Sequence, residues 1–264
     1  MLEAAFTTLA LIYHLTVNNL RKEQRNALAG LIMTVVRSLM MIAGFYLLFA
    51  LVGVRSSPLR GDFIVYIMSG IFMFQTHNAA IGAVASAGSP TNPMMMHGPI
   101  NTAVMIAASA LATLYRQTIS AIVILSFYHY VIQPIHLESA LMCYAMLILA
   151  WMSGCCIGLI FLAFRPWWPQ GAQVLSSFYQ RMNMIFSGKM FVANAMPAAL
   201  LPTFAWNPLF HIIDQTRGFA FINYSPRNSS LIYPVYCILG LWMVGLMAEF
   251  VSRKSISVSM MRGR

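Results

Sequence analysis

The chain has 264 residues, of which 59% are hydrophobic and 8% are charged. Its mean hydropathy is +0.72. Soluble globular domains carry about 25% charged residues, and so few charges cannot cover a water-facing surface of this size. The composition therefore excludes an ordinary soluble domain and indicates a protein that lipid solvates over much of its surface.

The net charge is +10, from 16 basic and 6 acidic residues. Proteins that bind nucleic acid are also basic, but their Lys and Arg cluster on a water-facing surface. Here many of the Arg residues interrupt apolar segments, which favours membrane anchoring and an anionic cargo over nucleic acid. The four cysteines lie in apolar segments without a CxxC pair, so we expect buried thiols rather than disulfides or a zinc site.

Residues 1–26 are predicted to form an amphipathic helix. Apolar residues from Leu2 to Leu20 recur at steps of three and four, and polar side chains take the other faces. A basic cluster, Arg21, Lys22 and Arg25, ends the segment. This pattern suits a helix that lies in the membrane interface. The alternative is a cytoplasmic helix packed on a partner.

Six segments after this helix are predicted to cross the membrane, because a helical span needs about 20 apolar residues. The fifth is the weakest, since it contains Gln180, Arg181 and Asn183. Short connectors with Pro, Gly and Ser separate the segments. We therefore expect an all-α integral membrane protein with spans at about 28–54, 63–85, 103–132, 140–164, 172–193 and 231–251.

The region 194–230, before the last span, is apolar enough for a membrane, but three prolines divide it into pieces too short to cross. Broken helices at membrane depth occur only where protein or water satisfies their backbone groups. Two short re-entrant helices within 194–222, near the outer face, are the prediction. A periplasmic loop with one surface helix is the alternative.

Lys and Arg in the connectors predict the orientation, because cytoplasmic loops carry an excess of both. More of them lie inside when the N-terminus is cytoplasmic, and an even number of spans then returns the basic C-terminal tail to the same side. The expected location is a bacterial inner membrane. The two halves share no period, which argues against a transporter built from inverted repeats.

Sequence signatures of enzymes are missing. The chain has no G-x-S-x-G, no H-E-x-x-H and no Walker A motif, and its carboxylates stand far apart. We expect no catalytic residue, metal or cofactor in this chain, so the energy for active transport would come from another chain or an ion gradient. An integral-membrane acyl- or glycosyltransferase is the alternative from another functional class.

Three arginines lie inside or near the apolar segments: Arg37, Arg116 and Arg181. Charge at membrane depth is costly, so such residues usually face a water-filled cavity or the protein interior. We expect Arg116 and Arg181 to line a cavity, whereas Arg37 could also anchor at the interface. Cations without an obvious carboxylate partner would attract anionic groups of a substrate. Aromatic side chains near them would hold the faces of sugar rings: Tyr115, Phe178 and Tyr179.

The stretch 184–220 carries a spaced motif of small, proline and polar residues. It contains Ser187-Gly188, Pro197, Trp206-Asn207-Pro208, His211, Asp214 and Arg217. The motif resembles the S-G…P…N-P…[ED]-x-x-R signature of ABC-type polysaccharide-export permeases, which export capsule and O-antigen. The capsule branch is the more similar, and the plan of nearly the whole chain agrees with the family.

The resemblance implies a homodimer that forms a channel for a lipid-linked, acidic polysaccharide. Two copies of a separate ABC ATPase subunit, which binds ATP and Mg, would drive it. A periplasmic co-polymerase or outer-membrane export protein is a further possible partner. The motif residues would form a periplasmic gate. The loop 86–101 would couple to the ATPase through Pro93, Met94, Met95, Met96 and His97.

Two features depart from the family pattern. An Arg-Phe-Gly-like stretch commonly follows the N-terminal helix, whereas this chain has Arg21-Lys-Glu-Gln-Arg25. An acidic residue often follows the coupling loop, whereas this chain has Asn101. Both departures concern the docking of the ATPase. An ABC permease for a drug or a lipid is the alternative within the same class.

Overall fold

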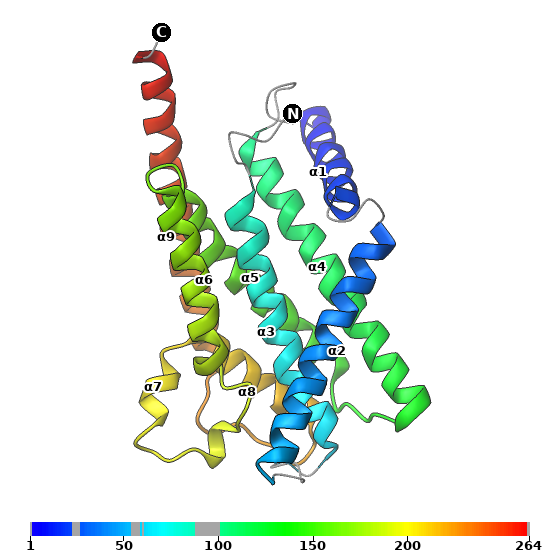
Figure 1. Ribbon diagram of the computed structural model, residues 1–264. Coiled ribbons are helices and arrows are strands. Elements are labelled where there is room, and N and C mark those ends of the chain that lie inside the picture. The colour runs from blue at the N-terminus through cyan, green and yellow to red at the C-terminus, as the bar shows by residue number, and fades with distance from the viewer. Residues whose placement is uncertain (1, 23–26, 54–58, 60, 88–100, 263–264) are drawn as a thin grey trace.

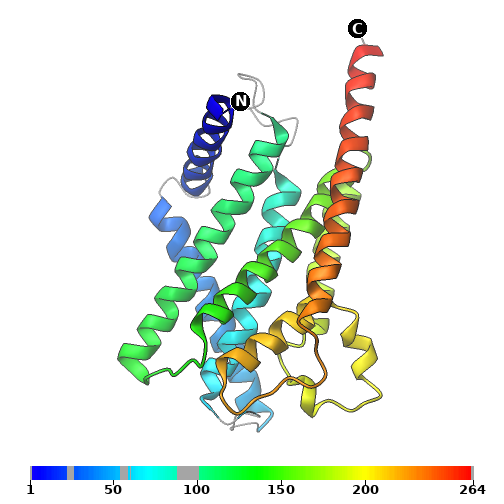
Figure 2. The same ribbon diagram turned by 180° about the vertical axis from the view of Figure 1, so that it is seen from behind.

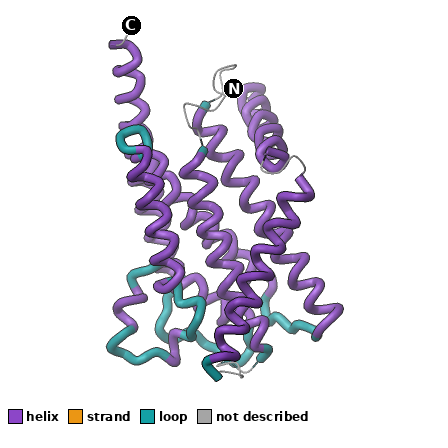
Figure 3. The backbone as a smooth tube through the Cα atoms, viewed as in Figure 1, coloured by secondary structure: helices purple, strands orange, loops and turns teal. Residues whose placement is uncertain are grey.

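The computed structural model describes residues 2–22, 27–53, 59, 61–87 and 101–262, and within these ranges the protein consists of helices and connecting loops without a strand (Figures 1 and 3). The longer helices are α1 (Leu2–Lys22), α2 (Ala27–Leu51), α3 (Phe63–Ser86), α4 (Thr102–Phe127), α5 (Ala140–Phe164), α6 (Pro169–Phe186), α8 (Pro208–Ala220) and α9 (Ile232–Arg262). Short pieces are the π-helical turn η2 (Tyr128–Ile132), the 3-10 turn η3 (Ala193–Ala195) and α7 (Leu201–Ala205).

Five helical segments are long and apolar enough to cross a membrane. They are Leu28–Leu51, Phe63–Ser86, Thr102–Ile132, Ala140–Phe164 and Ile232–Lys254. The prediction of a helical membrane protein is thus confirmed. The fifth predicted span, 172–193, overlaps α6, which has 18 residues and is not among these five. The count of six spans remains a prediction, and so do the re-entrant helices.

Polar side chains at the ends of connectors fix where several helices begin. Asp62 accepts a hydrogen bond from the backbone N–H of Ile64 at 2.9 Å, and Asn207 accepts one from Leu209 at 3.0 Å. Asn101 and Ser139 cap α4 and α5 in the same way. Such caps satisfy backbone donors that a helix leaves unpaired in its first turn.

Helix α3 forms the centre of the bundle. In the apolar 18-residue stretch of α3, 78% of the residues are buried, against 17% in the corresponding stretches of α2 and α9. Figures 1 and 2 show α3 between α2 and α6, with α4 and α5 behind it. The outer helices expose large apolar side chains, such as Leu47 and Met247, which lipid can solvate.

Two glycines allow α3 and α5 to approach closely. A Cβ atom on Gly154 would lie 2.3 Å from the backbone oxygen of His77, and one on Gly158 would lie 2.8 Å from the Cβ of Val84. His77 Nδ1 and Ser153 Oγ share a hydrogen bond of 2.7 Å across the same contact. Small residues commonly mediate close packing of membrane helices, so this contact joins α3 and α5 into one unit.

The two ends of the bundle differ. Helix α1 and the C-terminal end of α9 lie at one end, whereas α7, α8 and the loops around them lie at the other (Figure 1). Helix α1 packs on α4, where Leu15 is buried with Val104 and Ala108. Asn19 Nδ2 also donates a hydrogen bond to Ser109 Oγ at 3.2 Å. Helix α1 is therefore docked on the bundle through Leu11, Ile12 and Leu15, whereas Phe6, Leu9 and Tyr13 of the predicted apolar stripe are exposed.

We expect Gly154→Ala to lower the free energy of unfolding by about 1–3 kcal/mol, because the added methyl group forces the α3 backbone away. The measurement is thermal unfolding of the full chain in detergent. Gly240→Ala in α9 is the matched control, since nothing lies within 4 Å of its Cβ position. An equal melting temperature for the wild type and Gly154→Ala would contradict the close packing.

Candidate functional site: a polar cavity and the helices that close its far end

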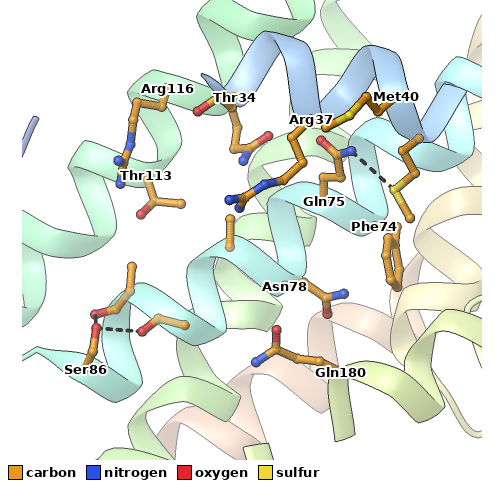
Figure 4. A pocket seen from close by; sticks show the side chains of 15 residues that line it. Thr34, Arg37, Met40, Phe74, Gln75, Asn78, Ser86, Thr113, Arg116 and Gln180 are labelled. Atoms are coloured by element: carbon orange, nitrogen blue, oxygen red, sulfur yellow. Dashed lines mark hydrogen bonds between the residues drawn. The ribbon is translucent and has the colours of Figure 1, made fainter. Parts of the chain in front are cut away.

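A cavity of about 740 Å³ opens over the polar side of α3 (Figure 4). Described side chains from four helices line it, and none of these is acidic. The lining residues are Thr34, Arg37, Met40 and Met41 of α2; Phe74, Gln75, Asn78, Ala79, Gly82, Ala83 and Ser86 of α3; Thr113, Arg116 and Gln117 of α4; and Gln180 of α6.

Arg37 and Arg116 reach this cavity from different helices. Arg37 extends from α2 and is exposed, whereas Arg116 extends from α4 and is partly buried. Figure 4 shows both side chains directed into the same hollow above α3. The structure thus gathers two of the three predicted arginines, and their combined charge makes the hollow favourable for an anion.

Neutral polar groups complete the lining. Gln75 is held in place because its Oε1 accepts a hydrogen bond of 2.5 Å from Ser38 Oγ. Its Nε2 lies 3.3 Å from the sulfur of Met41. The Oδ1 atom of Asn78 is buried and has no donor among the described residues. Polar groups gathered at membrane depth usually face water or a ligand, so this hollow is suited to a hydrated substrate.

The amides of α3 were missed by the reasoning from sequence. Gln75, Asn78, Gly82 and Ser86 recur at steps of three and four residues and all line the cavity. Such spacing places residues on one face of a helix. This polar stripe within an apolar segment was the available signal.

The other predicted pathway residues lie outside the cavity lining. Arg181 is exposed on α6, although the adjacent Gln180 lines the cavity. Tyr115 and Phe178 are exposed at 54% and 61% and also point elsewhere. The hydroxyl of Tyr179 instead lies 3.5 Å from His77 Nε2, toward α3. The aromatic residues therefore do not gather around the two arginines.

Arg217 is the centre of the region at the far end of the bundle. Its side chain is fully buried on α8. Nη1 donates to the backbone oxygens of Gly188 at 3.1 Å and Phe191 at 2.6 Å, and Nη2 donates to that of Lys189 at 2.6 Å. The guanidinium also lies 4.4 Å from the ring centroid of Tyr66 on α3. Arg217 therefore attaches the segment after α6 to both α8 and α3.

Gly188 permits this arrangement of the segment after α6. Its φ of +70° lies in the left-handed region, and a Cβ atom there would be 2.5 Å from the ring of Phe210. A residue with a side chain would be strained at this position. The Ser187-Gly188 pair of the motif is thus a turn, and the backbone oxygen of Gly188 faces Arg217.

Asp214, one turn before Arg217, holds the segment that leads to α9. It accepts hydrogen bonds from the hydroxyl of Tyr224 at 2.5 Å and from Ser229 Oγ at 2.7 Å. Burial and the hydrogen bond to the Asp214 carboxylate raise the pKa of Tyr224, so its hydroxyl remains a donor. The backbone N–H of Ala193 donates to the same carboxylate at 3.4 Å.

Asn207 and His211 connect α8 to the preceding helices. Asn207 Nδ2 donates to Asn183 Oδ1 at 2.6 Å and to the backbone oxygen of Phe186 at 3.1 Å. His211 Nε2 donates to the backbone oxygen of Ala205 at 2.7 Å, and its Nδ1 accepts from Ser230 N–H at 3.0 Å. These two contacts require the neutral ring.

The remaining motif residues lie at the surface of this end. Pro197 precedes α7 in an exposed loop. Trp206 is exposed, and its backbone oxygen accepts a hydrogen bond of 2.8 Å from the hydroxyl of Tyr233 on α9. Pro208 is the first residue of α8, where the missing N–H costs nothing. The motif residues thus serve to hold together the helices that follow α6.

The predicted coupling residues, Pro93, Met94, Met95, Met96 and His97, lie outside the described residues. The adjoining Asn101 is described: besides capping α4, its Oδ1 accepts a hydrogen bond of 3.0 Å from Arg253 of α9. Within the described ranges no three His, Cys, Asp or Glu side chains gather to hold a metal.

Comparison with models of known protein families and with curated protein sequences gives no match for the chain. The features that bear on function are thus the polar cavity and the region around Arg217.

We expect Arg217→Met to lower the free energy of unfolding by at least about 3 kcal/mol, because three buried carbonyl groups lose their donor. Thermal unfolding in detergent would measure this. The control is Arg227→Met, whose side chain is exposed, and it should leave the melting temperature unchanged. A similar melting temperature for both variants would show that the segment after α6 does not depend on Arg217.

Stability should also depend on pH through His211. Burial lowers its pKa, and the hydrogen bond to Ala205 and the charge of Asp214 oppose this only in part. The folded state therefore binds the proton less readily than the unfolded chain, so the stabilising contribution is present above about pH 6.5 and is lost as the pH falls below it. The wild type should melt above His211→Gln at about pH 7.5, with a smaller difference at about pH 5.5. A difference that is constant or grows in acid would contradict this.

Proposed function

We propose that the chain is the permease subunit of an ATP-driven exporter that moves an acidic, lipid-linked polysaccharide across a bacterial inner membrane. The observation that carries the proposal is the polar cavity, whose lining among the described residues contains Arg37 and Arg116 and no acidic side chain. Two cations beside neutral amides attract phosphate and carboxylate groups without fixing one orientation of the ligand. A polymer that slides through the protein needs contacts of this kind.

The exposed face of α6 supports a second copy of the chain as partner. Arg181 lies on this face with Gln173 and Ser177, and all three are exposed. Lipid solvates such groups poorly, whereas a water-filled conduit shared by two copies would satisfy them. Because the cavity is bounded by α2 on one side and α6 on the other, a second copy facing it would turn the hollow into a closed passage.

The two ends of the bundle fit an export direction. Helix α1 and the end of α9 share one end, where a cytoplasmic ABC ATPase would dock, and α7 and α8 occupy the opposite end (Figure 1). The network around Arg217 and Asp214 makes the α7–α8 region a compact cap over that end. In the proposed mechanism ATP binding by the partner separates the two copies, and the cap closes the conduit at the periplasmic side.

Arg116→Ala is expected to reduce export at least about tenfold, which corresponds to about 1.4 kcal/mol less favourable binding of the anionic cargo. The measurement is surface polysaccharide in cells that depend on this chain, with the ATPase encoded beside it co-purified to show assembly. Arg227→Ala, at an exposed position outside the cavity, is the matched control. Unchanged export by an assembled Arg116→Ala complex would remove the cavity from the pathway.

A further inference from the structure

A third basic side chain lies beside the cavity but does not line it. The side chain of Lys189 is 4% exposed. Its Nζ atom lies 3.4 Å from the ring centroid of Phe74 and 4.8 Å from that of Phe45. Within the part of the chain that the structure describes, this Nζ has no hydrogen-bond acceptor. Two aromatic rings offset only part of the cost of burying an ammonium group away from water.

The ring that contacts this ammonium is part of the cavity wall. Phe74 lines the cavity together with Arg37 and Gln75, and its side chain is 5% exposed (Figure 4). Lys189 itself is not among the lining residues. One aromatic side chain therefore stands between the buried amino group of Lys189 and a hollow that already holds the cationic groups of Arg37 and Arg116.

The backbone at Lys189 is fixed, so the side chain keeps its direction. Its backbone oxygen accepts the 2.6 Å hydrogen bond from Arg217 Nη2. Gly70 of α3 lets this segment approach, because a Cβ atom there would lie 2.9 Å from the same oxygen. The side chain of Lys189 has a flexible stem, and a turn of the Phe74 ring would open its amino group to the cavity.

We propose that Lys189 is a third cationic binding group for phosphate or carboxylate groups of the cargo, and that Phe74 covers it in the present state. The proposal rests on the export function argued above. Lys189 belongs to the segment held by α8, whereas Arg37 and Arg116 belong to α2 and α4. An anionic group would thus pass from the two arginines to Lys189 as it approaches the α7–α8 cap.

A role in packing alone makes a different prediction. In that case the ammonium stays against the rings in every state, and it never becomes accessible from the cavity. Accessibility of the amine to a water-borne reagent therefore separates the two roles. The chain has three lysines, Lys22, Lys189 and Lys254, and the exposed Lys254 gives an internal reference in each sample.

The experiment is acetylation of the full-length protein in detergent with a water-soluble acetyl ester, read at each lysine by mass spectrometry. We expect slow labelling of Lys189 in the wild type and a rise of about tenfold in Phe74→Ala, since removal of the ring uncovers the amine. Phe72→Ala is the matched control, because Phe72 is similarly buried on α3 but lines another pocket. It should label Lys189 as slowly as the wild type does.

The binding of anions is then tested on the uncovered amine. Trigalacturonate, which carries carboxylates, and inorganic phosphate should each slow the labelling of Lys189 in Phe74→Ala, whereas neutral maltotriose should not. Protection by one acidic probe alone would identify which group of the cargo Lys189 binds. Labelling of Lys254 should be the same throughout. Phe74→Leu, which keeps an apolar side chain, replaces Phe74→Ala if thermal unfolding shows that the alanine variant does not fold.

Each contrary result is distinct. The proposal that Phe74 covers Lys189 would be overturned if labelling of Lys189 stays slow in the Phe74 variants. It would also be overturned if labelling rises equally in Phe72→Ala. Fast labelling that neither acidic probe slows would overturn the binding of anions. Both failures leave the export proposal standing if Arg116→Ala still reduces export at least about tenfold. Conversely, protection of Lys189 together with normal export by Arg116→Ala would overturn the export proposal and keep the anion site.

Discussion

The structure depends on how a guanidinium group is accommodated where water is excluded. Arg217 meets three backbone carbonyl groups and the face of Tyr66. Its charge is spread over acceptors that the turn at Gly188 presents. A buried charge is tolerated only with such compensation, so α6, α8 and α3 must keep their relative positions. The same chemical group in Arg116 lines a polar hollow instead.

Helix α3 connects these two regions. Its N-terminal half contributes Tyr66 and Gly70 to the network around Arg217, and its C-terminal half contributes Gln75, Asn78 and Ser86 to the cavity. Phe74 stands at the boundary. Because α3 is packed on α5 through Gly154, the polar wall and the network belong to one rigid unit. Helix α2, of whose most apolar stretch 17% is buried, has more exposed surface and is free to change position around this unit.

The sequence was sufficient for the helical membrane class, since apolar runs of the required length leave few other solutions. It also indicated Arg37 and Arg116, because a charge inside such a run needs a polar environment. It could not assign Arg181 to a face. Successive residues differ by about 100° around a helix, so Gln180 faces the cavity while its neighbour does not. The sequence also could not predict the carbonyl partners of Arg217, because they lie in the turn after α6, which approaches α8 only in the folded structure.

The polar stripe of α3 has a consequence for biosynthesis. The apolar stretch of α3 has a mean hydropathy of 1.2, the lowest of the five candidate spans, although 78% of its residues are buried. A helix that carries amide side chains partitions weakly into lipid when it leaves the translocon without its neighbouring helices. Its stable insertion would then require α5, which is made later and is the most apolar of the five at 2.3. The polar residues of α3 that line the cavity thus make the stable insertion of this helix depend on the helices that follow it.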